Sequence, residues 1–503
     1  MQALKDQHVL VLGLGASGLA MARWCARHGA QVTIADTRDA PPQLQAFREQ
    51  LPQARFIAGA LDAALLEGAN MVLRSPGLSP EQVAPIVAPA RQRGIAVAGE
   101  LSLFAAALSE LKAQQAYAPA VLAVTGTNGK TTVTSLAGQL VERAGKTVAV
   151  AGNIGPTLLD TLGEKIDSGA LPQVWVIELS SFQLDAAGEF EPTSAAVLNV
   201  TQDHLDWHGN MQAYAAVKAR AFGKRALMIL NRDDPIVMGM LPPPVKLKGG
   251  RMEQRAYVTF GAGMPERPGD FGIEVVNSMA WLVRAMETDE TRKRRADAPE
   301  ELYIQRLIPA DALRIRGRHN AVNALAALAL AGSAGCALAP MLYGLREYRG
   351  EPHRVEPVGV IGGIEYFDDS KGTNVGATVA ALQGLGAERQ VVVILGGEGK
   401  GQDFAPLAEP VSRHARAAVL IGRDAPLIRA ALEPTRIPLV SAESMEQAVA
   451  LATQRARTGD AVLMSPACAS FDMFRNYPHR AQVFRAAVQR IADEAGVSLE
   501  LAA

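Results

Sequence analysis

The sequence has few cysteines and few aromatic residues, and its charges nearly cancel. Its three cysteines, Cys25, Cys336 and Cys468, are far apart and odd in number, which fits a reducing compartment better than a disulfide framework. Fifty basic residues stand against 51 acidic ones, so the net charge of -1 provides no overall field that attracts nucleic acid or an anionic membrane. No apolar run is long enough to span a bilayer, and the polar start at residues 1–7 lacks the apolar stretch of a signal peptide. We therefore expect a cytoplasmic protein without nucleic-acid binding or membrane insertion.

The chain is long enough for several hydrophobic cores. It has 503 residues, of which 49% are hydrophobic and 20% are charged, as in soluble globular proteins. Short apolar runs that end in polar residues recur along it, and we expect each run to be a buried strand of a parallel sheet. These runs are 9–12, 31–35, 71–73, 95–98, 121–124, 147–151, 174–179, 195–200, 226–230, 364–367, 391–395, 417–421 and 461–464.

Helical segments alternate with the apolar runs, which is typical of α/β folds. We expect helices at 17–28, from 131 to about 144 with Gly145 after its end, and at 320–330, and a capping box at Ser444 and Gln447. The sequence thus predicts three α/β domains in series: a Rossmann-like domain (1–115), a central P-loop ATPase-like domain (116–350) and a C-terminal Rossmann-like domain (351–503). The pattern weakens between 242 and 311. The charged stretch 287–300 is expected to be a solvated loop without chemistry.

The strongest single motif is Thr-Gly-Thr-Asn-Gly-Lys-Thr-Thr at 125–132, between an apolar strand and a helix. In such a loop, backbone N–H groups and the helix N-terminus surround phosphates, a lysine neutralises them and a hydroxyl binds Mg²⁺. Its spacing departs from the standard P-loop, because two residues rather than four separate Gly126 from Gly129. The motif predicts a nucleoside triphosphate site.

Polar residues at later strand ends extend this prediction. Glu178 ends one expected strand, where a carboxylate can hold Mg²⁺. Asn199 ends another, and His204 follows closely in Asp-His-Leu-Asp, which favours a metal or substrate role for the histidine.

A glycine motif near the amino end allows another interpretation. Gly13 to Gly18 form GxGxxG after the first strand, and Asp36 ends the second strand, which read alone would indicate NAD with the carboxylate on the ribose. The fingerprint by itself is weak. The downstream triphosphate site and the lack of a visible proton relay for a nicotinamide argue against NAD.

Several motifs in a fixed order carry a family resemblance. The runs GTNGKTT, GNIG at 152–155, ELSSFQL, LNVTQDHLDWH, GRHNAVNALAAL and EPHRVE resemble the ATP-dependent Mur ligases of bacterial cell-wall synthesis. The Asp36-Thr37-Arg38 loop, the 367–374 and 396–400 motifs and the 465–472 motif are similar to those of the members that add D-glutamate to UDP-N-acetylmuramoyl-L-alanine. Phe471 departs from that pattern, in which leucine is usual.

The resemblance implies roles for individual residues. The UDP-sugar is expected on Gly15, Ala16, Ser17, Asp36, Thr37, Arg38, Ser75, Gly77 and Asn153. ATP is expected on Gly126, Thr127, Asn128, Gly129, Lys130, Thr131, Thr132, Asn320, Asn323, Asp369 and Lys371. D-Glutamate is expected on Thr373, Lys400, Ser470, Phe471 and Tyr477. One Mg²⁺ is expected on Thr131 and Glu178 and a second on His204 and a carbamylated Lys218. The catalytic set is Lys130, Glu178, His204, Lys218 and Arg354.

The implied reaction forms an acyl phosphate from ATP and the substrate carboxylate, which the D-glutamate amine then attacks. We expect a monomer whose third domain closes on the second during turnover. Two alternatives remain open on the sequence: another Mur ligase or a folylpolyglutamate synthase-like enzyme, which would differ in the end domains, and a regulatory ATP-binding protein, which would need no amino-acid site.

Overall fold

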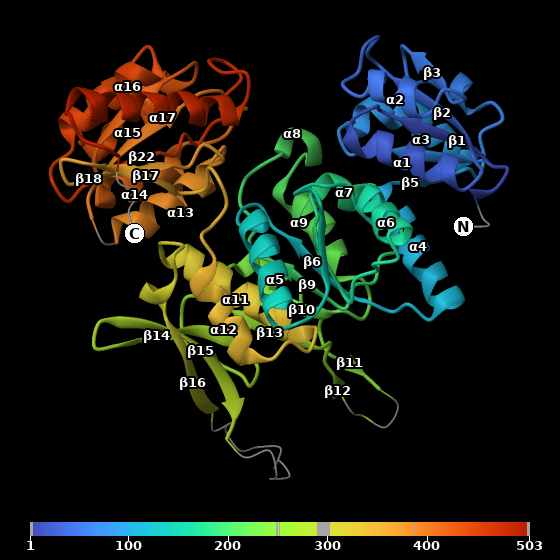
Figure 1. The fold of residues 1–503 in the computed structure, drawn as a ribbon, viewed down its shortest axis with the longest axis horizontal. Helices are drawn as coiled ribbons and strands as arrows, with labels where there is room; N and C mark the ends of the chain where they lie inside the picture. The colour runs from blue at the N-terminus through green and yellow to red at the C-terminus, as the bar shows by residue number, and fades with distance from the viewer. Residues whose placement is uncertain (1–3, 248–249, 251, 289–301, 388, 500–503) are drawn as a thin grey trace. The chain divides into compact units, whose positions relative to one another are not determined.

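A computed structural model describes residues 4–247, 250, 252–288, 302–387 and 389–499, and its helices and strands are drawn in Figure 1. The chain forms two compact units. One reaches from the amino end to Val200 and also holds His204–Thr259 and Ala326–Met341; the other holds Thr201–Asp203, Phe260–Leu325 and the chain from Leu342 onward. Within the described ranges, no helix combines the length and apolar content needed to cross a bilayer.

The first sheet is fully parallel, in the order β3-β2-β1-β4-β5. Its strands are β1 (His8–Leu12), β2 (Gln31–Asp36), β3 (Arg55–Ala58), β4 (Met71–Arg74) and β5 (Ala96–Ala98), with helices α1 (Ala16–Arg27), α2 (Leu44–Gln50) and α3 (Pro80–Gln92). Val9 to Leu12 are wholly buried, as expected of a strand covered on both faces. The chain order reverses between β1 and β4, so ligands are expected beyond the carboxyl ends of these two strands.

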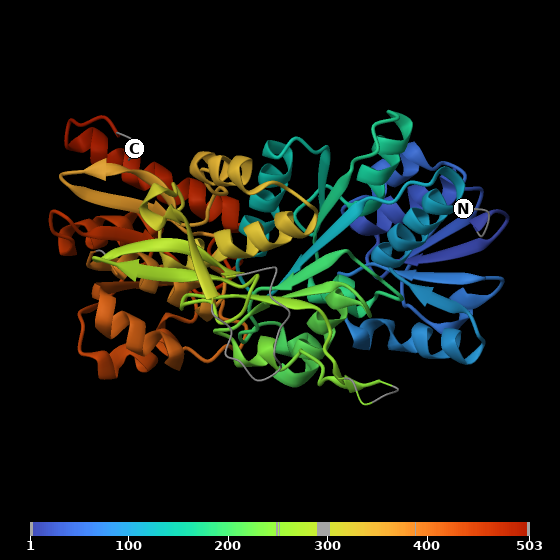
Figure 2. The same ribbon diagram turned by 90° about the horizontal axis from the view of Figure 1, so that it is seen from below.

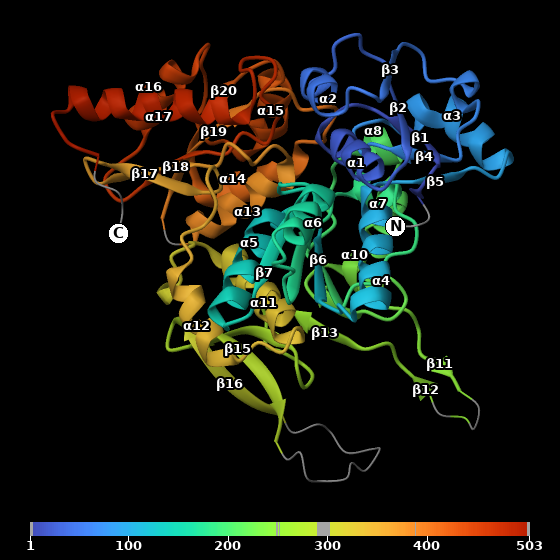
Figure 3. The same cartoon turned by 45° about the vertical axis from the view of Figure 1, so that its right-hand side comes forward.

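The middle sheet has the order β13-β10-β9-β6-β8-β7. Its strands are β6 (Ala120–Thr125), β7 (Val148–Gly152), β8 (Val174–Glu178), β9 (Ser194–Val197), β10 (Leu227–Asn231) and β13 (Tyr257–Phe260), and its helices include α4 (Glu100–Gln115), α5 (Lys130–Arg143), α6 (Leu158–Asp167), α7 (Ser181–Asp185), α8 (Leu205–His208) and α9 (Met211–Ala219). Helices α5 and α6 pack against β7 (Figure 3).

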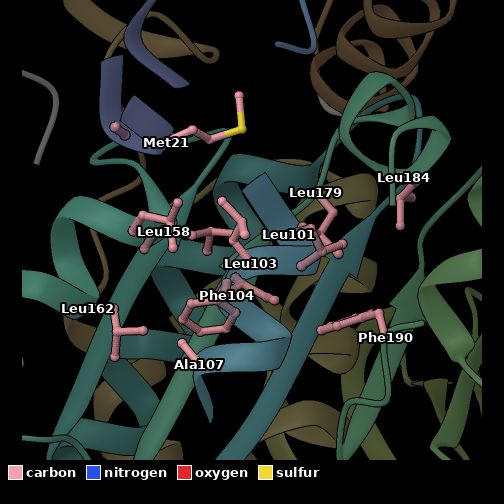
Figure 4. Packing of buried hydrophobic residues seen from close by; sticks show 14 of the residues in the cluster. Met21, Leu101, Leu103, Phe104, Ala107, Leu158, Leu162, Leu179, Leu184 and Phe190 are labelled. Atoms are coloured by element: carbon pink, nitrogen blue, oxygen red, sulfur yellow. The ribbon is translucent and has the colours of Figure 1, made fainter. Parts of the chain in front are cut away.

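One apolar core joins the first two sheets. Met21 of α1, Phe104 of α4 and Leu158 of α6 belong to the same buried cluster (Figure 4). The ring of Phe104 meets that of Trp175 on β8 edge to face, with centroids 5.1 Å apart. Burying such rings stabilises the cluster through apolar area and ring geometry together. Loops at the ends of both sheets therefore stand on a shared support.

The second unit contains an antiparallel and a mainly parallel sheet. The antiparallel one has β14 (Phe271–Val276), β15 (Met279–Glu287) and β16 (Leu302–Pro309), the yellow-green arrows in Figure 2. The other has the order β17-β18-β22-β19-β20-β21, and only β17 runs antiparallel to its neighbour. Its strands are β17 (Glu356–Ile361), β18 (Ile364–Asp368), β19 (Val391–Gly396), β20 (Ala415–Ile421), β21 (Leu439–Ser441) and β22 (Ala461–Met464), and helices that pack on it include α13 (Val375–Gly386), α16 (Met445–Arg455) and α17 (Tyr477–Glu494). Two further helices, α11 (Arg318–Ser333) and α12 (Leu338–Glu347), are divided between the two units.

The predicted fold class, three α/β domains in series, is confirmed, whereas the boundaries at 115 and 350 stay predictions. The expected strand 195–200 was too long, because β9 ends at Val197 and the Asn199 side chain that follows binds the backbone of Asn128. The capping box is half formed: Ser444 accepts from the Gln447 N–H, but the Gln447 side chain accepts from the Glu443 N–H. The antiparallel sheet lies in the region before residue 311, where the sequence pattern was too weak to predict it. Residues 289–300 of the charged stretch 287–300 lie outside the described residues.

Two glycines with positive φ allow a test of backbone packing. Gly152 ends β7 with φ +106°, and a Cβ there would lie 2.4 Å from the carbonyl oxygen of Glu178. Gly145 has φ +81°, and a Cβ there would meet no described atom within 4 Å. We expect Gly145→Ala to cost about 1 to 2 kcal/mol, the penalty of a left-handed backbone alone. Gly152→Ala should cost about 2 kcal/mol more because the Glu178 strand must also move. Calorimetric unfolding midpoints compare the two, and equal shifts would contradict the predicted clash.

Candidate active site

The phosphate loop lies between β6 and α5. Gly126 has φ +149°, and a Cβ there would come 3.0 Å from Leu198 Cβ, so the loop passes close to the end of β9. The Thr127 N–H donates to the Asn199 carbonyl (2.9 Å), and the Asn128 N–H donates to Asn199 Oδ1 (2.8 Å). Asn199 thus fixes the loop in shape before any ligand binds. Gly129, with φ +83°, is the N-cap of α5.

A lysine and two threonines of the motif begin helix α5. Lys130 Nζ donates to the carbonyl oxygens of Gly126 (3.1 Å) and Thr127 (2.8 Å), which holds the cation over the loop. Thr131 and Thr132 follow in the first turn, where the helix N-terminus carries partial positive charge. The arrangement suits an anion with several charged oxygens.

A buried carboxylate with an open coordination position ends β8. Glu178 is 1% exposed, and its Oε1 accepts a 2.6 Å hydrogen bond from Asn153 Nδ2. Its Oε2 is buried and has no hydrogen-bond partner in the described chain. Such an oxygen carries a large desolvation cost, which a bound cation would remove. The carboxylate therefore fits Mg²⁺, which prefers hard oxygen ligands.

His204 and Lys218 both lie close to Tyr214. The Lys218 side chain is 1% exposed, its Nζ donates to the Gly126 carbonyl (2.8 Å), and it lies 4.4 Å from the Tyr214 ring centroid. The His204 ring centroid lies 6.4 Å from that of Tyr214, whose hydroxyl is 3.3 Å from Thr127 Oγ1. His204 has φ +53°, an uncommon backbone state that is often found at functional sites.

Tyr214 is a site residue that sequence reasoning missed. It is 1% exposed and contacts two of the four predicted metal ligands, His204 and Lys218, as well as the phosphate loop. Its position four residues before Lys218 places the two side chains on one helix face, and this spacing was the available signal.

Asp36, the acidic residue beside the first glycine loop, is not free to bind a ribose hydroxyl. Asp36 is fully buried, and its Oδ2 accepts from the Leu14 N–H (2.7 Å). The Arg38 guanidinium donates to both Asp36 oxygens at 2.8 Å. Burial opposes ionisation of Asp36, but these donors outweigh it and hold its pKa below the usual value. The carboxylate therefore shapes the loop and orients Arg38, which argues against NAD.

The other residues predicted for the UDP-sugar gather at the same sheet edge. Gly15 is the N-cap of α1, Ala16 and Ser17 begin that helix, Thr37 follows β2, and Ser75 and Gly77 follow β4. Gly13 and Gly18 allow close packing, since a Cβ on Gly18 would lie 2.0 Å from the Gly13 carbonyl oxygen. Asn153, which is also predicted to bind this ligand, donates a hydrogen bond from its side-chain amide to Glu178.

Loops after three neighbouring strands of the last sheet carry the residues predicted for D-glutamate. Thr373 follows β18, Lys400 follows β19, and Ser470 and Phe471 follow β22; the order β18-β22-β19 brings these loops to one edge. Backbone hydrogen bonds between Glu398 and Ala469, at 3.0 and 2.9 Å, join two of the loops. Lys400 has φ +53°, and Phe471 is 67% exposed.

Residues predicted for the nucleotide also lie in this second unit. Asp369 accepts from Ser465 Oγ (2.6 Å) and from the Val355 N–H (3.2 Å), and burial raises its pKa to about 7 although nearby Arg354 opposes this. Lys371 Nζ lies 4.1 Å from the ring centroid of Tyr477, the first residue of α17.

Two asparagines predicted for the nucleotide occupy the start of α11. Asn320 Nδ2 donates to the Arg316 carbonyl (2.8 Å), and Asn323 Nδ2 donates to Asn320 Oδ1 (3.1 Å). The phosphate loop, Glu178, His204 and Lys218 belong to the first unit, whereas Asn320, Asn323, Arg354, Asp369 and Lys371 belong to the second.

Comparison with known proteins assigns this arrangement to a family. Three domain families match successive segments: "Mur ligase MurD-like, N-terminal domain" over residues 7–99, "Mur ligase middle domain" over 124–257 and "Mur ligase, glutamate ligase domain" over 353–468. The chain is 69% identical to the UDP-N-acetylmuramoylalanine--D-glutamate ligase of Albidiferax ferrireducens, with 100% of both chains covered. It is 58% identical to the ligase of the same name from Burkholderia thailandensis, with 98% of each covered.

Solved structures with little sequence identity share the fold. A pseudomurein peptide ligase type C from Methanothermus fervidus is 18% identical, with 97% of this chain and 100% of that chain covered and a TM-score of 0.53. The MurF ligase from Thermotoga maritima, solved in complex with ADP, is 15% identical, with 97% and 96% covered and a TM-score of 0.55. Through its three consecutive domain matches and its full-length relatives, the chain belongs to the Mur ligase family.

Proposed function

We propose that this chain is an ATP-dependent ligase that joins D-glutamate to UDP-N-acetylmuramoyl-L-alanine in peptidoglycan precursor synthesis. The observation that carries this proposal is its similarity along the whole chain to ligases named for that reaction. The three sets of loops support it, since each offers the chemistry that one substrate needs. ATP and UDP-sugars are both cytoplasmic metabolites, so we place the reaction in the cytoplasm.

The reaction begins at the phosphate loop. A carboxylate oxygen of the UDP-sugar peptide forms a bond to the γ-phosphorus of ATP while the bond to the β,γ-bridging oxygen breaks, which yields an acyl phosphate and ADP. Charge spreads over the equatorial oxygens of the transferring group, and Lys130, the N-terminus of α5 and Arg354 are the donors that we assign to it. The D-glutamate amine then bonds to the acyl carbon, inorganic phosphate leaves, and the nitrogen loses a proton.

We assign the Mg²⁺ ligands to the first unit. Thr131 and Glu178 would hold one Mg²⁺, and His204 and a carbamate on Lys218 would hold a second. Both ions would supply positive charge to the phosphate oxygens. The open Oε2 of Glu178 supports this assignment. A carbamate forms when the neutral lysine amine bonds to CO₂ and releases a proton. The placement of Lys218 Nζ, 2.8 Å from the phosphate-loop carbonyl of Gly126, supports a role at the reacting phosphate.

The end domains would supply the two other substrates. We assign the uridine and the phosphates to the loops around Asp36, Gly15 and Ser75, where the N-terminus of α1 favours an anion. D-Glutamate carries two carboxylates, which charge-assisted hydrogen bonds from Lys400 and hydroxyl donors such as Thr373 and Ser470 would recognise.

Omitting each substrate in turn tests the assignment as a whole. We expect phosphate release to require the UDP-sugar peptide, because that peptide supplies the attacking carboxylate, and peptide product to require D-glutamate rather than L-glutamate. Phosphate assays and chromatography of the product measure the two steps separately. Robust turnover with L-lysine, meso-diaminopimelate or a folate in place of D-glutamate would overturn the assignment.

Replacing Lys218 tests the metal assignment. Lys218→Ala should lose most activity, on the order of 100-fold or more, because the proposed carbamate helps to stabilise the transferring phosphoryl group. Small carboxylates added to the assay should restore part of the lost activity. Lys224→Ala is the matched control, since Lys224 is 80% exposed and pairs with Glu189 at the surface. Near-normal turnover by Lys218→Ala without additives would reject the role.

A further inference from the structure

Arg74 occupies the reversal point of the first sheet. It ends β4, pairs in register with Leu12 of β1, and directly precedes Ser75. The crevice beyond the carboxyl ends of β1 and β4 is where a doubly wound sheet binds its ligand. The Arg74 side chain starts at the edge of this crevice and is 10% exposed, so it is not a surface cation.

The contacts of Arg74 leave most of its hydrogen-bonding capacity unused. Nη2 donates to Asp185 Oδ2 at 2.5 Å, and the guanidinium carbon lies 6.0 Å from the ring centroid of Trp207 on α8. Nε is buried and has no hydrogen-bond partner among the residues that the structure describes. A guanidinium offers five N–H donors, and a buried donor without an acceptor is unfavourable. A missing acceptor is therefore expected beside Arg74.

A purely structural ion pair in the same unit shows a different geometry. Arg23 of α1 donates from Nε and Nη2 to the two oxygens of Asp160 (3.1 and 2.6 Å) and from Nη1 to Gln50 (2.7 Å). The Arg23 side chain is 35% exposed, so water can reach its remaining N–H donors. Arg23 therefore uses three of its N–H donors to join neighbouring elements. The described residues accept only one hydrogen bond from Arg74, which is largely shielded from water.

We propose that Arg74 is a positioning residue for the β-phosphate of the UDP-sugar substrate, an inference that rests on the proposed function. A phosphate matches the fork geometry of a guanidinium and supplies the acceptors that Nε lacks. Asp36 lies at the end of β2, on the other side of β1 from Arg74. A nucleotide with its nucleoside at Asp36 therefore carries its second phosphate toward β4. Asp185 and Trp207 hold the guanidinium ready for that contact.

Comparing two nucleotides tests this contact without any turnover. The dissociation constants of UDP and UMP, measured by calorimetry with the full chain, differ only through the β-phosphate. In Arg74→Ala the ratio of the UMP constant to the UDP constant should fall by about tenfold or more, the effect of one charged hydrogen bond. Arg74→Lys should lose less, because it keeps a point charge, and it provides the test if Arg74→Ala does not fold.

Arg23→Ala is the matched control, since it removes an ion pair between α1 and α6 outside the crevice and should leave the ratio unchanged. A ratio that is unchanged in both Arg74 variants would overturn the inference and leave Arg74 as a packing residue. The proposed function is checked separately, by turnover of the unaltered chain with D-glutamate. If that turnover is present while the ratio does not respond, only the role of Arg74 fails.

Discussion

The proposed metal site of the middle domain depends on the buried carboxylate of Glu178, of which the described residues hydrogen-bond only one oxygen. Asn153 binds one oxygen of Glu178, and the other oxygen is buried with no hydrogen-bond partner among the residues that the structure describes. A buried carboxylate oxygen without a hydrogen-bond donor has a desolvation cost that a bound cation would offset. The backbone enforces the arrangement, because Gly152 approaches the Glu178 carbonyl so closely that no side chain fits between them. The reaction brings a carboxylate and a triphosphate together. A cation bound beside Glu178 would offset the negative charge of these groups.

The same physical solution recurs at the edges of all three main sheets. Parallel strands end together, so polar loops that are far apart in the sequence meet beyond their carboxyl ends. In the first sheet these loops surround Asp36 and Ser75, and in the last sheet they carry Lys400 and Ser470. The apolar cluster of Met21, Phe104 and Leu158 joins the first and middle sheets, so their loops are supported by one core. Chemistry is thereby separated from stability: strands and helices form the cores, and short loops carry the reactive groups.

Strand positions followed from the sequence where a buried run ends in a polar residue, as at Glu178, or is followed by one, as at Met464 before Ser465. Some edge strands were missed, although the edge strands β5 and β7 were predicted. Strand β3 is short and only partly covered, and β17 begins with the partly exposed Glu356 and Pro357. The phosphate loop was predictable because its function requires local spacing. The contact of Tyr214 with Thr127 and that of Arg74 with Asp185 were not predictable, because these partners lie 87 and 111 residues apart in the chain. The carbamate proposed on Lys218 could not be predicted from the sequence pattern and rests on the family resemblance.

The proposed mechanism requires an acyl phosphate intermediate, and labelling with an oxygen isotope tests directly whether it forms. UDP-N-acetylmuramoyl-L-alanine labelled with ¹⁸O in its alanyl carboxylate is incubated with the enzyme, ATP, Mg²⁺ and D-glutamate, and the released phosphate is analysed by mass spectrometry. Because the carboxylate oxygen that attacks phosphorus leaves with the phosphate, the account predicts one ¹⁸O atom in each phosphate released during ligation. Phosphate that carries no label, with both labelled oxygens accounted for elsewhere, would show that ATP is hydrolysed without activating the carboxylate and would contradict the mechanism.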